Sequence, residues 1–166
     1  MFGLAGWSGS GKTTLLVSVM AEIIGRGLTV STIKHAHHNL DIDSPGKDTY
    51  RHREAGASEV ILLTSNRWAL MHELRGDPEP TPEELIQKLE PVDLVLVEGF
   101  KNHTHDKLEV YRPALGKPLL CGTDPHIVAV ASDAPLKTGG VPFFALEDTR
   151  GIADFITSRC HLAPAV

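Results

Sequence analysis

A glycine-rich stretch near the start of the chain constrains the fold more than any other feature. The apolar run MFGLA is followed directly by GWSGSGKTT, residues 6–14. Gly6, Gly11, Lys12 and Thr13 match the spacing G-x-x-x-x-G-K-[ST], in which small residues let backbone N–H groups surround phosphate oxygens. This motif lies between a strand and the positive end of a helix. The sequence therefore predicts an α/β fold whose first strand ends in a phosphate-binding loop.

The loop implies a nucleoside triphosphate and a metal ion. We expect Lys12 to reach the terminal phosphates and the Thr13 hydroxyl to hold Mg²⁺. Trp7 lies inside the loop. Its ring either lines a ligand pocket or covers the edge of the sheet, and the sequence leaves both open.

The rest of the chain fits a mostly parallel sheet with helices and one hairpin. The run VDLVLVEGF (92–100) is continuously apolar before its acidic end, which is typical of a strand covered on both faces. The other expected strands are 2–5, 29–34, 107–112, 126–132 and 141–146. Residues 58–74 predict a hairpin, and helices are expected at 13–26, 48–55, 82–90 and 148–159. At 166 residues, a single nucleotide-binding domain spanning 1–166 is the expected organisation.

Glu98 is the candidate metal carboxylate. A phosphate-binding loop needs an acidic residue for its metal, generally at the end of a strand beside the first one. Glu98 lies at the carboxyl end of the apolar run, where ligands of open α/β sheets bind, whereas Asp93 lies at the other end. A solvated acid at the end of the strand is the alternative for Glu98.

A polar loop, residues 35–48, follows the second expected strand. It carries His35, His37, His38, Asp41, Asp43, Lys47 and Asp48. The carboxylates, Asp43 among them, are hard oxygen ligands that favour Mg²⁺ over zinc. A transition-metal site and a merely solvated loop remain alternatives.

Asp133 is the candidate residue for reading the base. It follows the expected strand 126–132, and a carboxylate can accept two hydrogen bonds from guanine. It fits equally well as the residue that begins the turn before Ala134 and Pro135.

Composition restricts the partners. The net charge of −5 argues against nucleic acid and acidic membranes, which bind clustered lysine and arginine. The sequence has no apolar run of about 20 residues and no signal-peptide pattern at its start, so we expect a cytoplasmic protein. Its two cysteines have no metal-binding spacing and are interpreted as ordinary thiols.

Taken in order, several stretches resemble the MobB family, accessory proteins of molybdopterin-guanine dinucleotide biosynthesis. They are GWSGSGKTTL, IKHAHHNLDIDSPGKDTYRHREAGA, RWAL, LVLVEGFK and IVAVASD, and the resemblance covers about residues 2–160. It implies a dimeric adapter that binds GTP with Mg²⁺, hydrolyses it slowly or not at all, and assists a separate molybdopterin guanylyltransferase. Molybdopterin itself is a further candidate ligand. Carried over by position, the phosphate-binding residues are Gly9, Ser10, Gly11, Lys12, Thr13 and Thr14, and Glu98 faces the metal.

Two other functions compete with this one. Many proteins of the wider class that the family resembles carry an additional lysine early in the loop, near the position of Trp7, and this chain does not. A small-molecule P-loop kinase is the main alternative, with Arg51, Arg53 and Asp43 as candidates for lid and base. A signalling GTPase is weakened because N-K-x-D and D-x-x-G motifs are missing.

Overall fold

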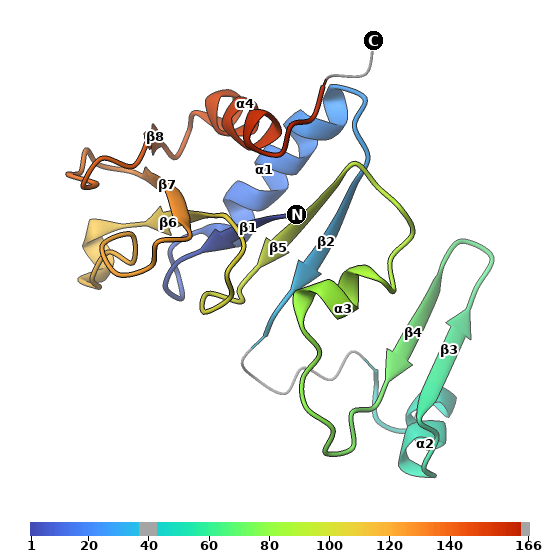
Figure 1. Ribbon diagram of the computed structural model, residues 1–166. Helices are drawn as coiled ribbons and strands as arrows, with labels where there is room; N and C mark the ends of the chain where they lie inside the picture. The colour runs from blue at the N-terminus through green and yellow to red at the C-terminus, as the bar shows by residue number, and fades with distance from the viewer. Residues whose placement is uncertain (37–42, 164–166) are drawn as a thin grey trace. The chain divides into compact units, whose positions relative to one another are not determined.

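The computed structural model describes residues 1–36 and 43–163, which fall into two compact units. The first unit comprises Met1–His35 and Pro82–Val166, and the second comprises Ala36–Thr81. Figure 1 traces both units along the chain, and each is described here by itself. Their folding as a single domain stays a prediction.

The first unit is built on a six-stranded sheet in which every pairing is parallel. The strand order is β2-β5-β1-β6-β7-β8. The strands are β1 (Phe2–Ala5), β2 (Val30–Lys34), β5 (Leu94–Glu98), β6 (Lys107–Tyr111), β7 (Ile127–Ser132) and β8 (Phe143–Ala145). A short 3₁₀ helix, η1 (Pro113–Leu115), follows β6. The predicted α/β fold with a parallel sheet is confirmed, and β5 directly adjoins β1 as expected.

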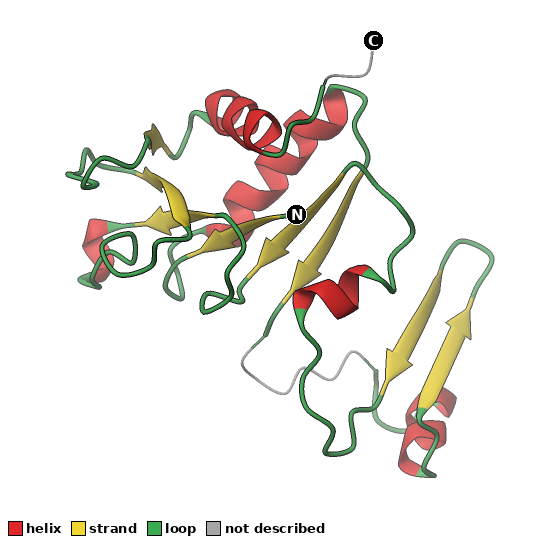
Figure 2. Ribbon diagram, viewed as in Figure 1, coloured by secondary structure: helices red, strands yellow, loops and turns green. Residues whose placement is uncertain are grey.

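Helices cover both faces of this sheet, which gives three layers (Figure 2). Helices α1 (Lys12–Gly25) and α4 (Thr149–Arg159) pack on one face, where Leu94 and Leu96 belong to the main apolar core. The short helix α3 (Pro82–Ile86) lies on the other face, over Val95 and Val97. Side chains of a strand alternate between faces, so a continuous apolar run is needed wherever both faces are covered.

A side-chain cap marks the start of α4, whereas α3 ends without such a signal. Asp148 caps α4 by accepting a hydrogen bond from the Gly151 N–H (2.9 Å), and the predicted start of that helix is confirmed. The helix expected at 82–90 is shorter than predicted, because α3 ends at Ile86. Beyond it the N–H groups of Lys88 and Leu89 reach back only three residues, so the chain tightens into turns.

Buried charges hold loops over part of the second sheet face. Lys107 and Glu109 of β6 are both fully buried. The Lys107 ammonium donates to the carbonyls of Lys101 (3.0 Å) and His103 and pairs with Asp124 (2.8 Å). Glu109 accepts hydrogen bonds from two backbone N–H groups of the loop after η1. Burial raises the pKa of Glu109, and these N–H groups oppose the shift. Charged side chains thus fix loops where no helix covers the sheet.

The second unit consists of α2 (Asp48–Glu54) and an antiparallel hairpin. Strand β3 (Glu59–Leu63) pairs with β4 (Trp68–His72), with Leu63 opposite Trp68 next to the turn. The hairpin predicted at 58–74 and the helix predicted at 48–55 are confirmed. No helix among the described residues is both long and apolar enough to cross a membrane.

Candidate phosphate-binding site

The phosphate loop lies at the carboxyl end of β1 and packs tightly against β6. Gly6 adopts a φ of 140°, and a Cβ at this position would lie 2.4 Å from the carbonyl oxygen of Val110. Gly9 and Gly11 have φ values of 80° and 95°, which non-glycine residues rarely adopt. The loop conformation therefore depends on glycine at these positions.

Helix α1 begins directly after this loop and has no side-chain cap. Gly11 occupies the cap position, and the first turn contains no acidic residue. The first N–H groups of a helix have no partner within it and carry the positive end of its dipole. The N-terminus of α1 is therefore suited to an anion, in contrast to α4, which Asp148 caps.

Thr13 and Glu98 come together as the sequence predicted for a metal pair. The Thr13 hydroxyl donates to Oε1 of Glu98 at 2.7 Å, although 85 positions separate them in the chain. Lys34, at the end of β2, approaches the same oxygen at 3.7 Å. The strand register explains this meeting, because Glu98 pairs with Leu4 of β1 on one side and with Lys34 on the other. Two hard oxygen donors side by side fit Mg²⁺.

The Lys12 side chain lies against the loop that precedes it. Its ammonium donates to the carbonyl oxygen of Trp7 at 2.9 Å. Burial lowers the pKa of Lys12, Glu98 opposes this shift, and the positive charges of Lys101 and Lys34 add to it. Several cations thus converge where the motif predicts phosphate.

The sequence did not single out Arg112, which connects the loop to Asp133. Arg112 follows β6, and its Nε donates to the carbonyl oxygen of Ser10 at 3.0 Å. Its Nη1 pairs with Asp133 at 2.6 Å. Arg112 therefore connects Asp133 to the phosphate loop. The role of Asp133 in reading the base stays a prediction. Arg112 had no sequence signal, because only the parallel register of β6 and β7 brings the two residues together.

Ser10 provides a test of whether the loop fits a phosphate ligand. The residue is 1% exposed, and its Oγ has no hydrogen-bond partner within the described parts of the chain. A buried hydroxyl without a partner costs about 1–3 kcal/mol. A phosphate oxygen or an ordered water would satisfy this group, so the loop fits the ligand that its motif predicts.

Trp7 lies between two lysines at the rim of the loop. Its indole N–H donates to the carbonyl oxygen of Pro118 at 2.8 Å. The ammonium groups of Lys101 and Lys117 lie 4.9 Å and 5.7 Å from the ring centroid. The half-buried ring is thus a platform for cations at the edge of the sheet.

Asp43 belongs to the second unit, where its carboxylate has partners of its own. It accepts from the Thr49 hydroxyl (2.9 Å) and lies 3.5 Å from Nε of Arg53, which also pairs with Glu73. Its role as a metal ligand stays a prediction. His37, His38 and Asp41 of the polar loop lie outside the described residues. Arg53, a lid candidate for a kinase, is engaged by these two carboxylates.

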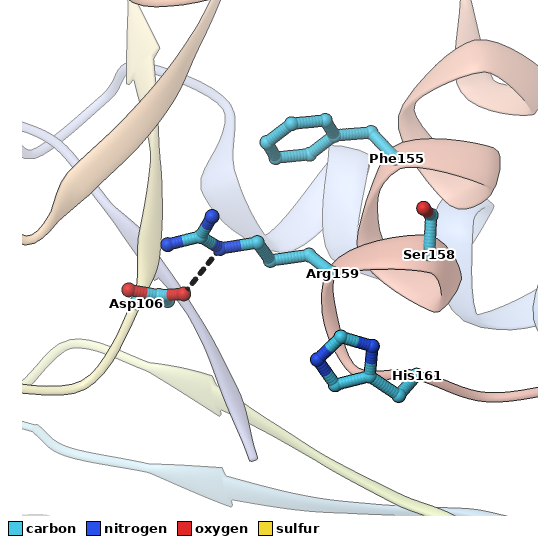
Figure 3. A pocket seen from close by; sticks show the side chains of 5 residues that line it. All are labelled: Asp106, Phe155, Ser158, Arg159 and His161. Atoms are coloured by element: carbon cyan, nitrogen blue, oxygen red, sulfur yellow. Dashed lines mark hydrogen bonds and ion pairs between the residues drawn. The ribbon is translucent and has the colours of Figure 1, made fainter.

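A separate cavity lies at the opposite end of the strands. It measures about 630 Å³ and is lined by Asp106, Phe155, Ser158, Arg159 and His161. Figure 3 shows the Arg159 guanidinium turned toward Asp106, with an Nε–Oδ2 distance of 2.7 Å. Asp106 immediately precedes β6, so this cavity is at the amino end of the sheet. Nucleotides bind open parallel sheets at the carboxyl end, which favours the phosphate loop as the functional site.

Comparison with known proteins identifies the family. The family described as "MobB: Molybdopterin guanine dinucleotide synthesis protein B" matches residues 1–133. The chain belongs to the MobB family. A protein of Escherichia coli named molybdopterin-guanine dinucleotide biosynthesis adapter protein is 40% identical, with 94% of this chain and 90% of the relative aligned. A protein of the same name from Haemophilus influenzae is 42% identical, with 97% and 89% aligned.

Solved structures of the MobB family share this fold. A crystal structure described as molybdopterin-guanine biosynthesis protein B superposes with a TM-score of 0.74 at 25% identity and covers 95% of this chain and 98% of its own. Bacillus subtilis MobB has a TM-score of 0.72 at 24% identity, with coverage of 95% and 96%. The family resemblance predicted from the sequence is confirmed. Membership makes this chain an adapter protein of molybdopterin-guanine dinucleotide biosynthesis.

Proposed function

We propose that this adapter binds Mg²⁺-GTP in the phosphate loop and assists a molybdopterin guanylyltransferase, with slow or no hydrolysis of its own. The single observation that carries the proposal is the hydrogen bond between Thr13 and Glu98 beside a glycine-rich loop. Thr13 and Glu98 would hold the metal, and Gly9, Ser10, Gly11, Lys12 and Thr14 would hold the phosphates. Bound Mg²⁺ supplies neutralising charge for the phosphates.

An adapter acts through a difference in the affinity of a ligand for two states of the protein, and it does not need fast hydrolysis. Within the described residues of the first unit, the carboxyl edge of the sheet presents lysines, an arginine and helix N–H groups, which bind and neutralise an anion. This chemistry supports a nucleotide-dependent surface for a protein partner. Molybdopterin, which carries a phosphate, is a second ligand that such an edge could accept, and we extend the proposal to it.

Titration calorimetry with GTP and with ATP, each with and without Mg²⁺, tests the proposed function. We expect Mg²⁺-GTP to bind at least about tenfold more tightly than Mg²⁺-ATP, a difference of about 1.4 kcal/mol. We also expect chelation of Mg²⁺ to weaken GTP binding, because Thr13 and Glu98 then no longer hold a metal ion that neutralises the phosphates. Equal or tighter binding of ATP would favour the small-molecule kinase instead.

Asp133→Asn serves as the base-specificity variant in the same titration. The change replaces one of the two carboxylate oxygens that guanine would use with an NH₂ donor, so we expect the preference for GTP over ATP to decrease. Asp93→Asn is the matched control. Asp93 lies at the amino end of β5, away from the phosphate loop, and its carboxylate accepts hydrogen bonds from the N–H and the hydroxyl of Thr29. An unchanged preference in Asp133→Asn would leave Asp133 with its partner Arg112 as a structural pair only.

We further propose that the protein is a homodimer and that the hairpin takes part in the contact. Strands β3 and β4 form a two-stranded sheet of their own and expose five large apolar side chains. They are Ile61, Leu62, Leu63, Trp68 and Leu70. Monomeric proteins rarely expose apolar patches of this kind, and open strand edges favour pairing with another chain.

Sedimentation analysis of Leu63→Asp tests the dimer. Leu63 is 73% exposed, so a charge there should leave the hairpin fold intact while it disfavours an apolar contact between subunits. We expect the wild-type protein to sediment as a dimer at micromolar concentration and the variant to shift toward monomer by at least about tenfold in dissociation constant. Leu115→Asp, on η1, is the control and should stay dimeric. A monomeric wild-type protein would contradict the proposal.

A further inference from the structure

We propose that Lys101 binds the terminal phosphate of the nucleoside triphosphate and so makes the affinity depend on that phosphate. The inference rests on the proposed function and deepens it. It assigns a second lysine at the terminal phosphate to the loop after β5. The position of Trp7 in the phosphate loop itself carries no such lysine.

The backbone before Lys101 turns sharply toward the phosphate loop. Gly99 has a φ of 98°, and Phe100, which is not glycine, has a φ of 47°. A left-handed residue with a side chain costs about 1–2 kcal/mol, and such strain is found at functional sites. The Phe100 ring packs against the His35 ring in a tilted arrangement, with 4.5 Å between the ring centroids, which helps to hold this conformation. The turn therefore places Lys101 back over the carboxyl edge of the sheet.

The Lys101 ammonium lies over a residue of the phosphate loop itself. Its Nζ is 4.9 Å from the Trp7 ring centroid, while the Trp7 carbonyl oxygen binds the Lys12 ammonium. The Lys101 backbone is fixed because its carbonyl oxygen accepts a hydrogen bond from the buried Lys107 ammonium (3.0 Å). The Lys101 backbone is therefore held in place while its ammonium lies beside the phosphate loop.

The charges around the loop favour a multiply charged anion. Among the described residues, the Lys12 ammonium is influenced by the positive charges of Lys101 and Lys34 and by the negative charge of Glu98. Like charges at close range repel in a partly buried site, and a phosphate ligand relieves that repulsion. The electrostatic influence of Lys101 reaches Lys12, the residue expected at the terminal phosphates. The terminal phosphate is therefore the group that Lys101 is best placed to bind.

Lys101→Met, titrated with the slowly hydrolysed analogue GppNHp and with GDP, tests the inference. Loss of one charged hydrogen bond should weaken Mg²⁺-GppNHp binding by about 10- to 100-fold and Mg²⁺-GDP binding by less than about threefold. Lys117→Met is the matched control, because its ammonium also lies near Trp7 and it is exposed. We expect both affinities in the control to stay within about threefold of wild type.

Tryptophan fluorescence gives a second readout in a Trp68→Phe background, which leaves Trp7 as the only tryptophan. We expect GppNHp and GDP to change the emission of Trp7 differently, and Lys101→Met to remove that difference. Equal losses for both nucleotides in Lys101→Met, or behaviour like Lys117→Met, would overturn the inference while the proposed function stands. Failure of the wild-type protein to bind GppNHp would instead overturn the proposed function.

Discussion

We expect Lys12→Ala to weaken the binding of Mg²⁺-GTP by about 100-fold or more. The change removes the ammonium that the loop holds through the Trp7 carbonyl, and a charged hydrogen bond to phosphate contributes about 1.5–3 kcal/mol. It also removes a positive charge from a partly buried site, where its attraction for phosphate is screened less than at the surface. Titration calorimetry against wild type measures the loss.

The control for this result is Lys117→Ala, which removes a lysine from the same edge outside the motif. Its affinity should stay within about threefold of wild type, because exposed charges contribute little. Circular dichroism should show the same secondary structure for both variants. Unchanged GTP affinity in Lys12→Ala would defeat the assignment of the phosphate loop.

We expect Lys107→Met to lower the free energy of unfolding by about 3 kcal/mol. Lys107 is fully buried, and its ammonium serves two backbone carbonyls and the Asp124 carboxylate. Methionine fills a similar volume but donates no hydrogen bond, so buried acceptors lose their donor and Asp124 loses its charge partner. Urea denaturation at pH 7 measures the change.

Lys117→Met is the control for this experiment too, because the same chemical change at an exposed lysine should alter stability by less than about 0.5 kcal/mol. A value for Lys107→Met equal to that of the control would mean that the loops are held by other contacts. Lys107→Met should also weaken the preference for a terminal phosphate, since Lys107 fixes the backbone of Lys101.

The parts of the fold that the sequence predicted are those with strong local signals. The apolar run of β5 predicted a strand covered on both faces, and all five of its residues are buried. The helix expected at 148–159 agrees with α4, and the structure adds that Asp148 caps its first turn. The end of α3 was wrong by four residues, because no glycine marks it and tertiary contacts decide where such a short helix stops.

The candidate site was predictable only where a motif orders its residues along the chain. The loop itself and Glu98 followed from spacing and from the rule for strand ends. Arg112, Lys34 and Lys101 were not singled out, because they reach the loop from three other strand ends, and that convergence depends on strand order rather than on spacing. The buried Lys107 had no signal either, since a charged residue in an alternating strand usually faces water.

The strand order also governs when the site can form during synthesis. β1 and β2 are not neighbours in the sheet, because β5 lies between them, and β6 pairs with the other edge of β1. A nascent chain that ends before residue 94 therefore carries the whole glycine-rich loop but has neither strand against which β1 pairs. Such long-range parallel pairing is slow to form, because the chain loses loop-closure entropy before the distant strands gain any stabilising contact. The proposed nucleotide site can therefore be complete only after β5 and β6 have been synthesised.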